Sequence, residues 1–288
     1  MKKVIIFGTG GYGLYALNSL DEIEYQVLCF VDNVKEFQGQ TFYGYYVDAP
    51  ENVFKYDFDY IILPVSAYAE QMRQQLSPPH DTQNLVPLDK FVEFHPNAKG
   101  VIWDELRIAM LRRCIEEIKE NHVPGSMAEL GVYQGDFAKF LNRCLPERRL
   151  YLFDTFSGFD SKDQTDKDVG LKSRSDWFSD GSEDLVLSKM SRKESCVIRK
   201  GYFPDTARGL ERETYCFVSL DADLYKPILA GLEYFYPRLS PGGYIFVHDF
   251  VPLSFGPGVR DAVREYCSAH RISYVPMLDR QGSVVITK

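Results

Sequence analysis

The chain has 288 residues, of which 45% are hydrophobic and 26% are charged, and its formal net charge is −8. This length accommodates two domains, and the ordinary composition excludes disordered and fibrous proteins. Residues 1–98 carry 6 Lys and Arg against 13 Asp and Glu, a net charge of −7. Because nucleic acids and anionic membranes are bound mainly through basic surface, a small-molecule partner is expected instead.

The first residues argue against a targeting or membrane segment. Only four apolar residues follow Lys3 before the first glycine cluster, which is too short for a signal peptide or a membrane span. We therefore expect a cytoplasmic protein without membrane insertion. A homo-oligomer is possible, and the sequence does not decide the oligomeric state. The six cysteines form no Cys-x-x-Cys pair and are expected to be reduced packing residues rather than disulfide or zinc ligands.

Strand and helix patterns alternate through the first third of the chain, which predicts a parallel sheet. The predicted strands are residues 3–8, 25–31, 60–63 and 84–88, and the predicted helices are residues 11–20 and 66–76. A turn-forming stretch at 95–100 predicts a linker. The first domain is therefore expected to comprise residues 1–98 and the second residues 99–288.

Gly8, Gly10 and Gly13 form a G-x-G-x-x-G between the first strand and helix, where glycine backbone can approach a phosphate. Asp32 ends the next strand 19 residues later, where an acid can accept from ribose hydroxyls. The loop is a candidate site for a nucleotide, a nucleotide sugar or an NAD-like ligand. Alternatively, the glycines only permit close packing of the helix on the sheet. No residue suits hydride transfer, so a dehydrogenase is not expected.

Residues 1–90 also resemble a known type of domain. Val31-Asp32-Asn33 and Gly44-Tyr45 occur in the order typical of the small Rossmann-like domain at the front of some bacterial sugar-modifying enzymes. The resemblance implies a nucleotide or nucleotide-sugar binding function for this part of the chain.

A second alternating series begins after residue 122. A helix is predicted over 101–122 from apolar residues at helical spacing. The predicted strands are 126–131, 149–154, 196–200, 215–220 and 243–248, the predicted helices are 136–144, 227–236 and 259–270, and a final hairpin joins 272–276 to 283–287. This order predicts an α/β fold, a doubly wound parallel sheet with one antiparallel strand. The polar insertion at 157–184 is either a lid or substrate loop, or a solvated excursion.

Four residues in this series suggest a cofactor site. Gly131 and Gly135 follow a strand and precede a helix, where a ligand carboxylate is favoured, and Glu129 is placed to accept from an amino group. Asp154 ends the next strand, 19 residues after Gly135, in position to accept both ribose hydroxyls. S-adenosylmethionine combines these groups. The alternatives are a packing turn at 131–135 and, for Asp154, a cap on the turn that follows it.

Acidic residues end two further strands. Asp221 and Asp223 follow one strand, and His248 and Asp249 follow another. Carboxylates at neighbouring strand ends can share a hard cation such as Mg²⁺ or Mn²⁺, which lowers the pKa of a bound hydroxyl. Asp221, His248 and Asp249 are therefore the candidate catalytic and metal-binding residues. The alternatives are strand-end capping for the acids and a structural hydrogen bond for His248.

Several blocks between residues 123 and 263 resemble, in the same order, the macrocin O-methyltransferase family. The blocks are Glu129-Leu-Gly-Val-Tyr-Gln-Gly135, Phe153-Asp-Thr-Phe-Ser-Gly158, Lys200-Gly-Tyr-Phe-Pro-Asp-Thr206, Leu220-Asp-Ala-Asp-Leu-Tyr225, Tyr236-Pro-Arg-Leu-Ser-Pro-Gly-Gly243 and His248-Asp249. The family consists of metal-dependent enzymes that methylate sugar hydroxyls on macrolides and related glycosides. The resemblance implies a class I S-adenosylmethionine-dependent methyltransferase fold for the second domain.

The resemblance also implies roles for single residues. Glu129, Gly131 and Asp154 are expected to contact the methyl donor, and Asp180 or Ser182 to lie near its adenine.

By the same resemblance Asp221 is a metal ligand, but the family usually carries two adjacent acids where this chain has His248 and Asp249. An imidazole either ligates, which favours manganese or iron over magnesium, or stays free as a base. The leading hypothesis is a sugar O-methyltransferase that acts on a glycan-, nucleotide- or metabolite-linked sugar. The alternatives are a non-catalytic nucleotide or nucleotide-sugar sensor on a methyltransferase scaffold, and a catechol-type phenol O-methyltransferase.

Overall fold

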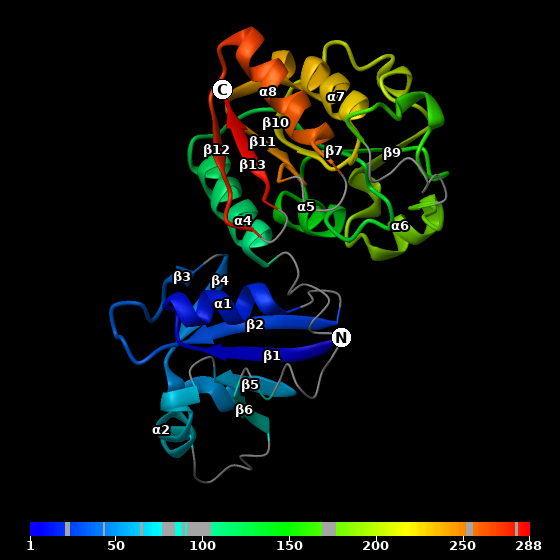
Figure 1. The fold of residues 1–288 in the computed structure, drawn as a ribbon. Helices are drawn as coiled ribbons and strands as arrows, with labels where there is room; N and C mark the ends of the chain where they lie inside the picture. Colours follow the sequence, from blue (N-terminus) through cyan, green and yellow to red (C-terminus); the bar gives the residue numbers. More distant parts are fainter. Residues whose placement is uncertain are drawn as a thin grey trace. The chain divides into compact units, whose positions relative to one another are not determined.

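The computed structural model describes residues 1–20, 24–42, 44–63, 66–76, 84–87, 90, 105–168, 177–251, 256–279 and 282–288. The chain divides into two compact units, residues 1–109 and 110–288 (Figure 1). The predicted linker at 95–100 and the predicted boundary between residues 98 and 99 lie outside the described residues.

The N-terminal unit contains a six-stranded sheet in the order β3-β4-β2-β1-β5-β6. Its strands are β1 (Lys2–Phe7), β2 (Tyr25–Val31), β3 (Thr41–Phe42), β4 (Tyr45–Asp48), β5 (Tyr60–Leu63) and β6 (Leu85–Pro87), and its helices are α1 (Gly11–Ser19) and α2 (Ser66–Leu76). All neighbouring strands are parallel except β3 and β4, which pair antiparallel. The predicted parallel sheet is therefore confirmed, with β3 and β4 added.

Strand β1 is buried on both faces, which explains its unbroken apolar run. Val4 and Ile6 belong to the same buried cluster as Leu17 of α1. Ile5 and Phe7 belong to a second cluster, which includes residues of α2. Since successive side chains of a strand point to opposite faces, one helix covers each side of β1.

The C-terminal unit contains a seven-stranded sheet in the order β12-β13-β11-β10-β7-β8-β9. Its strands are β7 (Ser126–Leu130), β8 (Leu150–Asp154), β9 (Cys196–Lys200), β10 (Tyr215–Leu220), β11 (Leu239–Val247), β12 (Tyr274–Pro276) and β13 (Val284–Thr287). Its helices are α5 (Ala138–Cys144), α6 (Glu183–Lys189), α7 (Tyr225–Arg238) and α8 (Gly258–His270), and α4 (Glu105–Glu120) contains the division between the two units. Strands β7 to β11 are parallel, and β13 alone runs against its neighbours β11 and β12.

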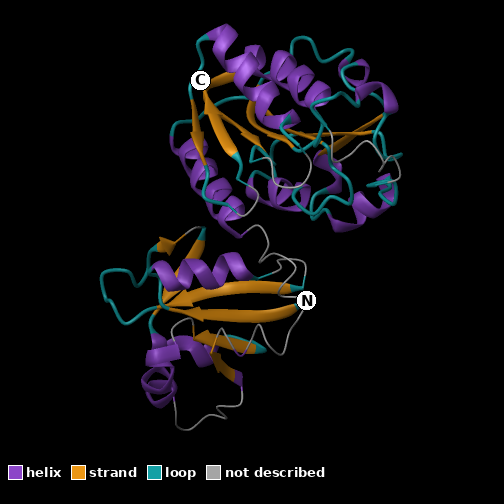
Figure 2. Cartoon of the chain, viewed as in Figure 1, coloured by secondary structure: helices purple, strands orange, loops and turns teal. Residues whose placement is uncertain are grey.

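The strand order of this sheet indicates at which edge a ligand is expected to bind. Helices lie on both faces of the strands (Figure 2), and side chains of α7 and α8 share one buried cluster with β7, β10 and β11. The order reverses between β7 and β10, since β8 and β9 follow on one side and β11 on the other. In doubly wound sheets ligands bind at the carboxyl ends of the strands at such a reversal. Residues that follow β7 and β10 therefore line the expected crevice.

Part of the predicted polar insertion is an integral part of this unit. Asp163 and Asp168 are only 5% and 1% exposed. The interpretation of this stretch as a solvated excursion is therefore wrong for Asp163 and Asp168, whereas Ser161, Lys162 and Asp166 are exposed. Residues 169–176 of the insertion lie outside the described residues.

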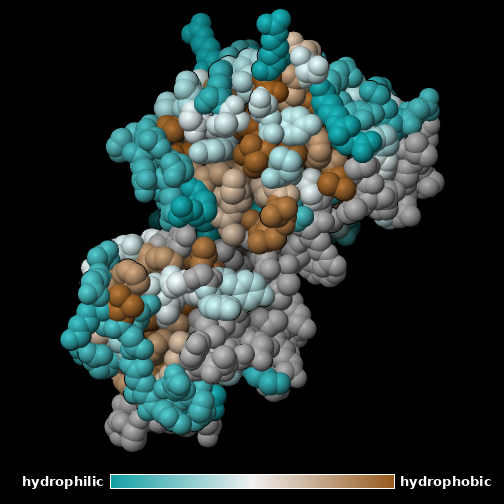
Figure 3. Space-filling view, turned by 60° about the vertical axis from the view of Figure 1, so that its left-hand side comes forward, coloured by the Kyte–Doolittle hydropathy of each residue, from teal (hydrophilic) through white to brown (hydrophobic). Residues whose placement is uncertain are grey.

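Hydrophobic residues reach the surface of both units in the view of Figure 3. The exposed large hydrophobic residues are Met1, Tyr12, Tyr15, Val34, Phe37, Tyr46, Leu106, Met110, Val251, Val275 and Leu278. Exposed apolar side chains are normal on folded proteins. None of the described helices combines the length and the apolar character needed to cross a membrane.

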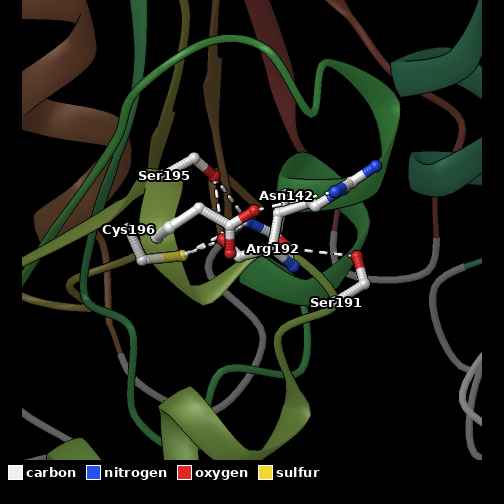
Figure 4. Close-up of polar contacts among 6 residues, drawn as sticks. Asn142, Ser191, Arg192, Ser195 and Cys196 are labelled. Carbon is white, nitrogen blue, oxygen red and sulfur yellow. Dashed lines mark hydrogen bonds and ion pairs between the residues drawn. The ribbon is translucent and has the colours of Figure 1, made fainter.

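A buried amide joins α5 to the segment between α6 and β9 (Figure 4). Asn142 is 1% exposed. Its Nδ2 donates to the carbonyl oxygen of Arg192 at 2.9 Å and to Ser195 Oγ at 3.1 Å, and its Oδ1 accepts from the Arg192 backbone N–H at 2.8 Å and from Ser191 Oγ at 3.1 Å. One side chain thus satisfies both backbone groups of Arg192.

We expect Asn142→Ala to lower the free energy of unfolding by about 1–3 kcal/mol, because the backbone N–H of Arg192 and the hydroxyl of Ser191 lose their acceptor. Urea unfolding measures this change. Asn121→Ala is the matched control, since Asn121 is exposed and bonds only to Glu117, one turn away. Equal effects of the two substitutions would contradict a structural role for the Asn142 cluster.

Candidate active site

The loop after β7 requires glycine at two positions. Gly131 has a φ of +86°, and a Cβ there would lie 2.0 Å from the backbone oxygen of Asp221. Gly135 has a φ of +81°, and a Cβ there would lie 3.2 Å from Val186 of α6. The predicted cofactor loop therefore touches the backbone of the predicted metal site on one side and α6 on the other.

Asp154, at the end of β8, holds this loop in shape. Its Oδ2 accepts from the backbone N–H groups of Val132 at 2.8 Å and Tyr133 at 2.7 Å, and its Oδ1 accepts from the N–H of Phe156 at 2.7 Å. The last bond is the turn cap considered from the sequence. Three of the roughly four lone-pair positions of the carboxylate are occupied. The position left on Oδ1 offers a ribose one hydrogen bond rather than two.

Glu129 lies two residues before Gly131 and is 1% exposed. It occupies the centre of the sheet, with Ser219 of β10 and Leu152 of β8 as its register partners. Its carboxylate therefore belongs to the strand that leads directly into the glycine loop.

The segment before α6 folds onto the same loop. Gln134 Nε2 donates to Asp180 Oδ2 at 3.0 Å, and a hydrogen bond to Asp180 raises the pKa of Tyr133. A Cβ on Gly181 would lie 2.6 Å from the backbone oxygen of Tyr133. Ser182 caps α6, because its Oγ accepts from the N–H of Leu185 at 3.2 Å. Asp180 is thus in contact with the glycine loop, whereas the Ser182 hydroxyl serves the helix.

Asp221, His248 and Asp249 come together at the carboxyl ends of β10 and β11. His248 Nδ1 lies 2.9 Å from Asp221 Oδ1 and 2.9 Å from Asp249 Oδ2. The Asp221 backbone N–H donates to the Leu130 carbonyl at 2.8 Å, which fixes the end of β10 beside the end of β7. The structure therefore brings the three predicted metal residues together, next to the predicted cofactor loop.

Asp223 completes the acidic cluster. Burial, followed by the nearby carboxylates of Asp249 and Asp221, raises its pKa well above the ordinary aspartate value. Asp223 and Asp249 have φ values of +57° and +55°, in the left-handed region that residues other than glycine seldom adopt. Such strained backbone persists where the surrounding structure enforces it, and it is frequent at functional sites.

The cluster fits a divalent cation. One ligand atom from each of Asp221, His248 and Asp249 lies within 4.8 Å of the other two. The two 2.9 Å separations match the roughly 3 Å between adjacent ligands of an octahedral ion whose bonds are about 2.1 Å long. Two carboxylates with one imidazole suit Mn²⁺, and they also accommodate Mg²⁺.

The predicted loop of the N-terminal unit has a comparable geometry. Gly8 has a φ of +100°, and a Cβ on Gly13 would lie 1.9 Å from the Gly8 carbonyl oxygen. Close helix-to-strand packing, the alternative considered for these glycines, therefore applies to Gly13. Gly10 precedes α1 as its N-cap, and the space around it is open.

Asp32 supports this loop as Asp154 supports the other. Its Oδ2 accepts from the backbone N–H of Thr9 at 2.7 Å and from Thr9 Oγ1 at 2.8 Å, and its Oδ1 accepts from the N–H of Val34 at 2.9 Å. Asp32 is 8% exposed. As in Asp154, three of the roughly four lone-pair positions are occupied, and one position on Oδ1 is left for a ribose hydroxyl.

Comparisons with known proteins identify the family of the chain. Residues 69–284 match the family model described as Macrocin-O-methyltransferase (TylF), and residues 1–81 match a model described as C2185-like, N-terminal. Mycinamicin III 3''-O-methyltransferase from Micromonospora griseorubida is 27% identical over 205 residues, which cover 66% of this chain and 79% of that enzyme. Demethyldecarbamoylnovobiocin O-methyltransferase from Streptomyces niveus is 26% identical over 189 residues, which cover 61% of this chain and 71% of that enzyme.

Among solved structures, the O-methyltransferase NovP superimposes with a TM-score of 0.56 at 24% identity, over 64% of this chain and 80% of that chain. This likeness supports the methyltransferase fold of the C-terminal unit. The matched family segment contains the whole glycine loop and the whole acidic cluster. The chain therefore belongs to the macrocin O-methyltransferase family and is an O-methyltransferase.

Proposed function

We propose that the protein transfers a methyl group from S-adenosylmethionine to a hydroxyl of a sugar, with the help of a divalent cation. One observation carries this proposal: Gly131 of the cofactor loop lies against the backbone of Asp221, so a donor on the loop adjoins the acidic cluster. The relatives support a sugar acceptor, since one is named as a methyltransferase of a rhamnosyl group, from Streptomyces olivaceus.

In this proposal the donor lies along the carboxyl ends of β7 and β8. Glu129, Gly131 and Gly135 flank its amino acid part, and the remaining acceptor position of Asp154 takes a ribose hydroxyl. Asp180 contacts the glycine loop from outside and lies on the adenine side, with Ser182 holding α6 in place.

The acceptor is activated at the acidic cluster. Asp221, His248 and Asp249 would hold the cation, which when bound supplies a Lewis acid that lowers the pKa of an acceptor hydroxyl. The Nδ1 of His248 faces two carboxylates, which supports a ligand role for this residue rather than that of a free base.

Asp223 is the proposed general base, because its carboxylate lies beside those of Asp221 and Asp249 and is not one of the three proposed metal ligands. The acceptor oxygen attacks the methyl carbon, the bond from that carbon to the sulfonium sulfur breaks, and S-adenosylhomocysteine leaves. The hydroxyl proton passes to a carboxylate oxygen of Asp223. The protein's contribution is to align the hydroxyl with the methyl group and to receive the proton.

The test is transfer of label from methyl-labelled S-adenosylmethionine in the presence of Mn²⁺ or Mg²⁺. The acceptor panel contains nucleotide-linked sugars, glycosides and catechol. Labelled sugar is the expected product. Labelled catechol with no labelled sugar would favour the phenol O-methyltransferase alternative, and failure to bind the donor would favour the non-catalytic sensor.

We further propose that the loop after β1 binds a nucleotide, a nucleotide sugar or an NAD-like ligand. The open space around Gly10 supports phosphate contacts, and the acceptor position left on Asp32 Oδ1 can take one ribose hydroxyl. Calorimetric titration of the full chain with uridine diphosphate, a nucleotide sugar and NAD tests it. Gly10→Asp should abolish binding by charge repulsion without disturbing the fold. Unchanged binding by this variant would contradict the proposal.

A further inference from the structure

A buried carboxylate outside the acidic cluster is aimed at the loops that carry that cluster. Asp168 is 1% exposed. Its Oδ2 accepts from Thr165 N at 2.9 Å and from Thr165 Oγ1 at 2.6 Å, and its Oδ1 accepts from the backbone N–H of Tyr225 at 3.0 Å. Tyr225 is the first residue of α7 and follows Asp223 by two positions. Asp168 therefore fixes the end of the loop that contains Asp221 and Asp223.

The same carboxylate touches the start of α8. A Cβ on Gly258 would lie 2.1 Å from Asp168 Oδ1 and 3.2 Å from Tyr225 N. Gly258 is the first residue of α8, ten residues after His248, and residues 252–255 between them lie outside the described residues. One oxygen atom thus lies between the first turns of α7 and α8.

Helix α7 depends on this contact for its cap. Leu224, its N-cap residue, makes no side-chain cap hydrogen bond, and the first turn contains no acidic residue. Asp168 supplies both an acceptor and a negative charge at this helix N-terminus, each of which stabilises a helix start. The two loops also contain Asp223 and Asp249 with left-handed backbone, a conformation that needs restraint from its surroundings.

The segment that carries Asp168 is itself held in place. Tyr202, in the loop after β9, donates its hydroxyl to Asp163 Oδ1 at 2.7 Å. Lys167 Nζ lies 3.6 Å above the Tyr225 ring and 3.5 Å from Glu265 Oε2 of α8. These contacts therefore hold the segment before Asp168 in a fixed position.

We propose that Asp168 is a positioning residue for methyl transfer, which holds the loop after β10 and the start of α8 at the spacing at which the acidic cluster binds its cation and the acceptor. This inference rests on the proposed function of that cluster. It assigns the insertion a role in aligning the catalytic groups.

Two substitutions disturb the contact from its two sides. Asp168→Ala removes the carboxylate, and Gly258→Ala pushes it away. Because a displacement of about 1 Å can cost about 100-fold in rate, we expect each to lower kcat by about 10- to 100-fold and to weaken Mn²⁺ binding about tenfold. Affinity for S-adenosylhomocysteine should change less than about twofold, because the donor loop follows other strands. Calorimetry without acceptor measures both affinities independently of activity.

The double variant makes the test specific. In the Asp168→Ala background the methyl group of Gly258→Ala no longer meets Asp168 Oδ1. The kcat of the double variant should therefore be less than about twofold below that of Asp168→Ala alone. Glu213→Ala is the matched control. Glu213 also accepts two part-buried hydrogen bonds, from Ser126 Oγ at 2.8 Å and from Tyr151 OH at 3.0 Å. It lies beside the amino ends of β7 and β10, at the opposite edge of the sheet from the acidic cluster. The Glu213→Ala substitution should lower the free energy of unfolding without weakening Mn²⁺ binding.

Single variants that retain wild-type kcat and Mn²⁺ affinity, or additive effects in the double variant, would overturn the positioning role. If Asp168→Ala does not fold, Gly258→Ala alone tests the positioning role. An unchanged Mn²⁺ affinity in that variant contradicts the inference. A wild-type protein that neither binds Mn²⁺ nor transfers a methyl group would instead refute the proposed function on which the inference rests.

Discussion

Replacing Gly131 with alanine should lower the free energy of unfolding by about 3–5 kcal/mol and abolish measurable binding of S-adenosylhomocysteine. The φ of +86° disfavours any side chain, and the new Cβ would lie 2.0 Å from the Asp221 carbonyl oxygen. Since that oxygen belongs to the backbone, the end of β10 has to move away from β7. Urea unfolding and calorimetric titration measure the two effects.

Gly209→Ala separates the clash from the backbone strain. Gly209 has a nearly identical φ of +85°, but a Cβ added there would meet no atom within 4 Å. Gly209→Ala should therefore lower the free energy of unfolding only by the backbone strain, about 1–2 kcal/mol, and leave donor binding intact. If the two alanine variants lose equal stability, the close approach of the cofactor loop to Asp221 is not what makes glycine necessary at position 131.

Asp221→Asn should reduce kcat/KM by about 1000-fold, or about 4 kcal/mol of transition-state stabilisation, and Mn²⁺ affinity by about 100-fold. The substitution removes one of two carboxylates that lie 2.9 Å from His248 Nδ1. Donor affinity should persist, because the contact between Asp221 and Gly131 involves the backbone oxygen, which the substitution preserves. Steady-state kinetics and calorimetry separate these effects.

The matched control for Asp221→Asn is Asp57→Asn in the N-terminal unit. The side chain of Asp57 is 92% exposed and pairs with Lys3 at the surface. This control should match the wild-type protein in rate and in Mn²⁺ affinity. Retention of full activity by Asp221→Asn, in a protein that still binds the donor, would remove Asp221 from the proposed mechanism.

The main elements of the fold and the place of the site follow from local sequence patterns. Buried parallel strands produce nearly continuous apolar runs, such as Tyr215–Leu220, in which only Ser219 is polar, and the acidic residues after them mark the carboxyl edge of the sheet. Because neighbouring parallel strands end at one edge, the sequence was sufficient to predict that Asp221, His248 and Asp249 meet. Strands β3 and β4 were missed because they have only two and four residues and lack a buried apolar run.

Contacts between distant segments were not accessible to this reasoning. Asp154 and Asp32 occupy the predicted positions, but most of their hydrogen-bonding capacity serves the glycine loops, which depends on loop geometry. The polar composition around Asp168 left a lid or substrate loop and a solvated excursion as alternatives, whereas the contact of Asp168 with the N-terminus of α7 involves a residue 57 positions later. Likewise, only the structure shows why a side chain does not fit at Gly258.

The most direct test of this account is a crystal structure of the protein grown with S-adenosylhomocysteine and Mn²⁺, with anomalous diffraction data to locate the metal. The account predicts the nucleoside beside Asp154 and Asp180, and one Mn²⁺ ion bound by Asp221, His248 and Asp249. Homocysteine sulfur far from this ion, or metal density absent from the three side chains at saturating Mn²⁺, would contradict it.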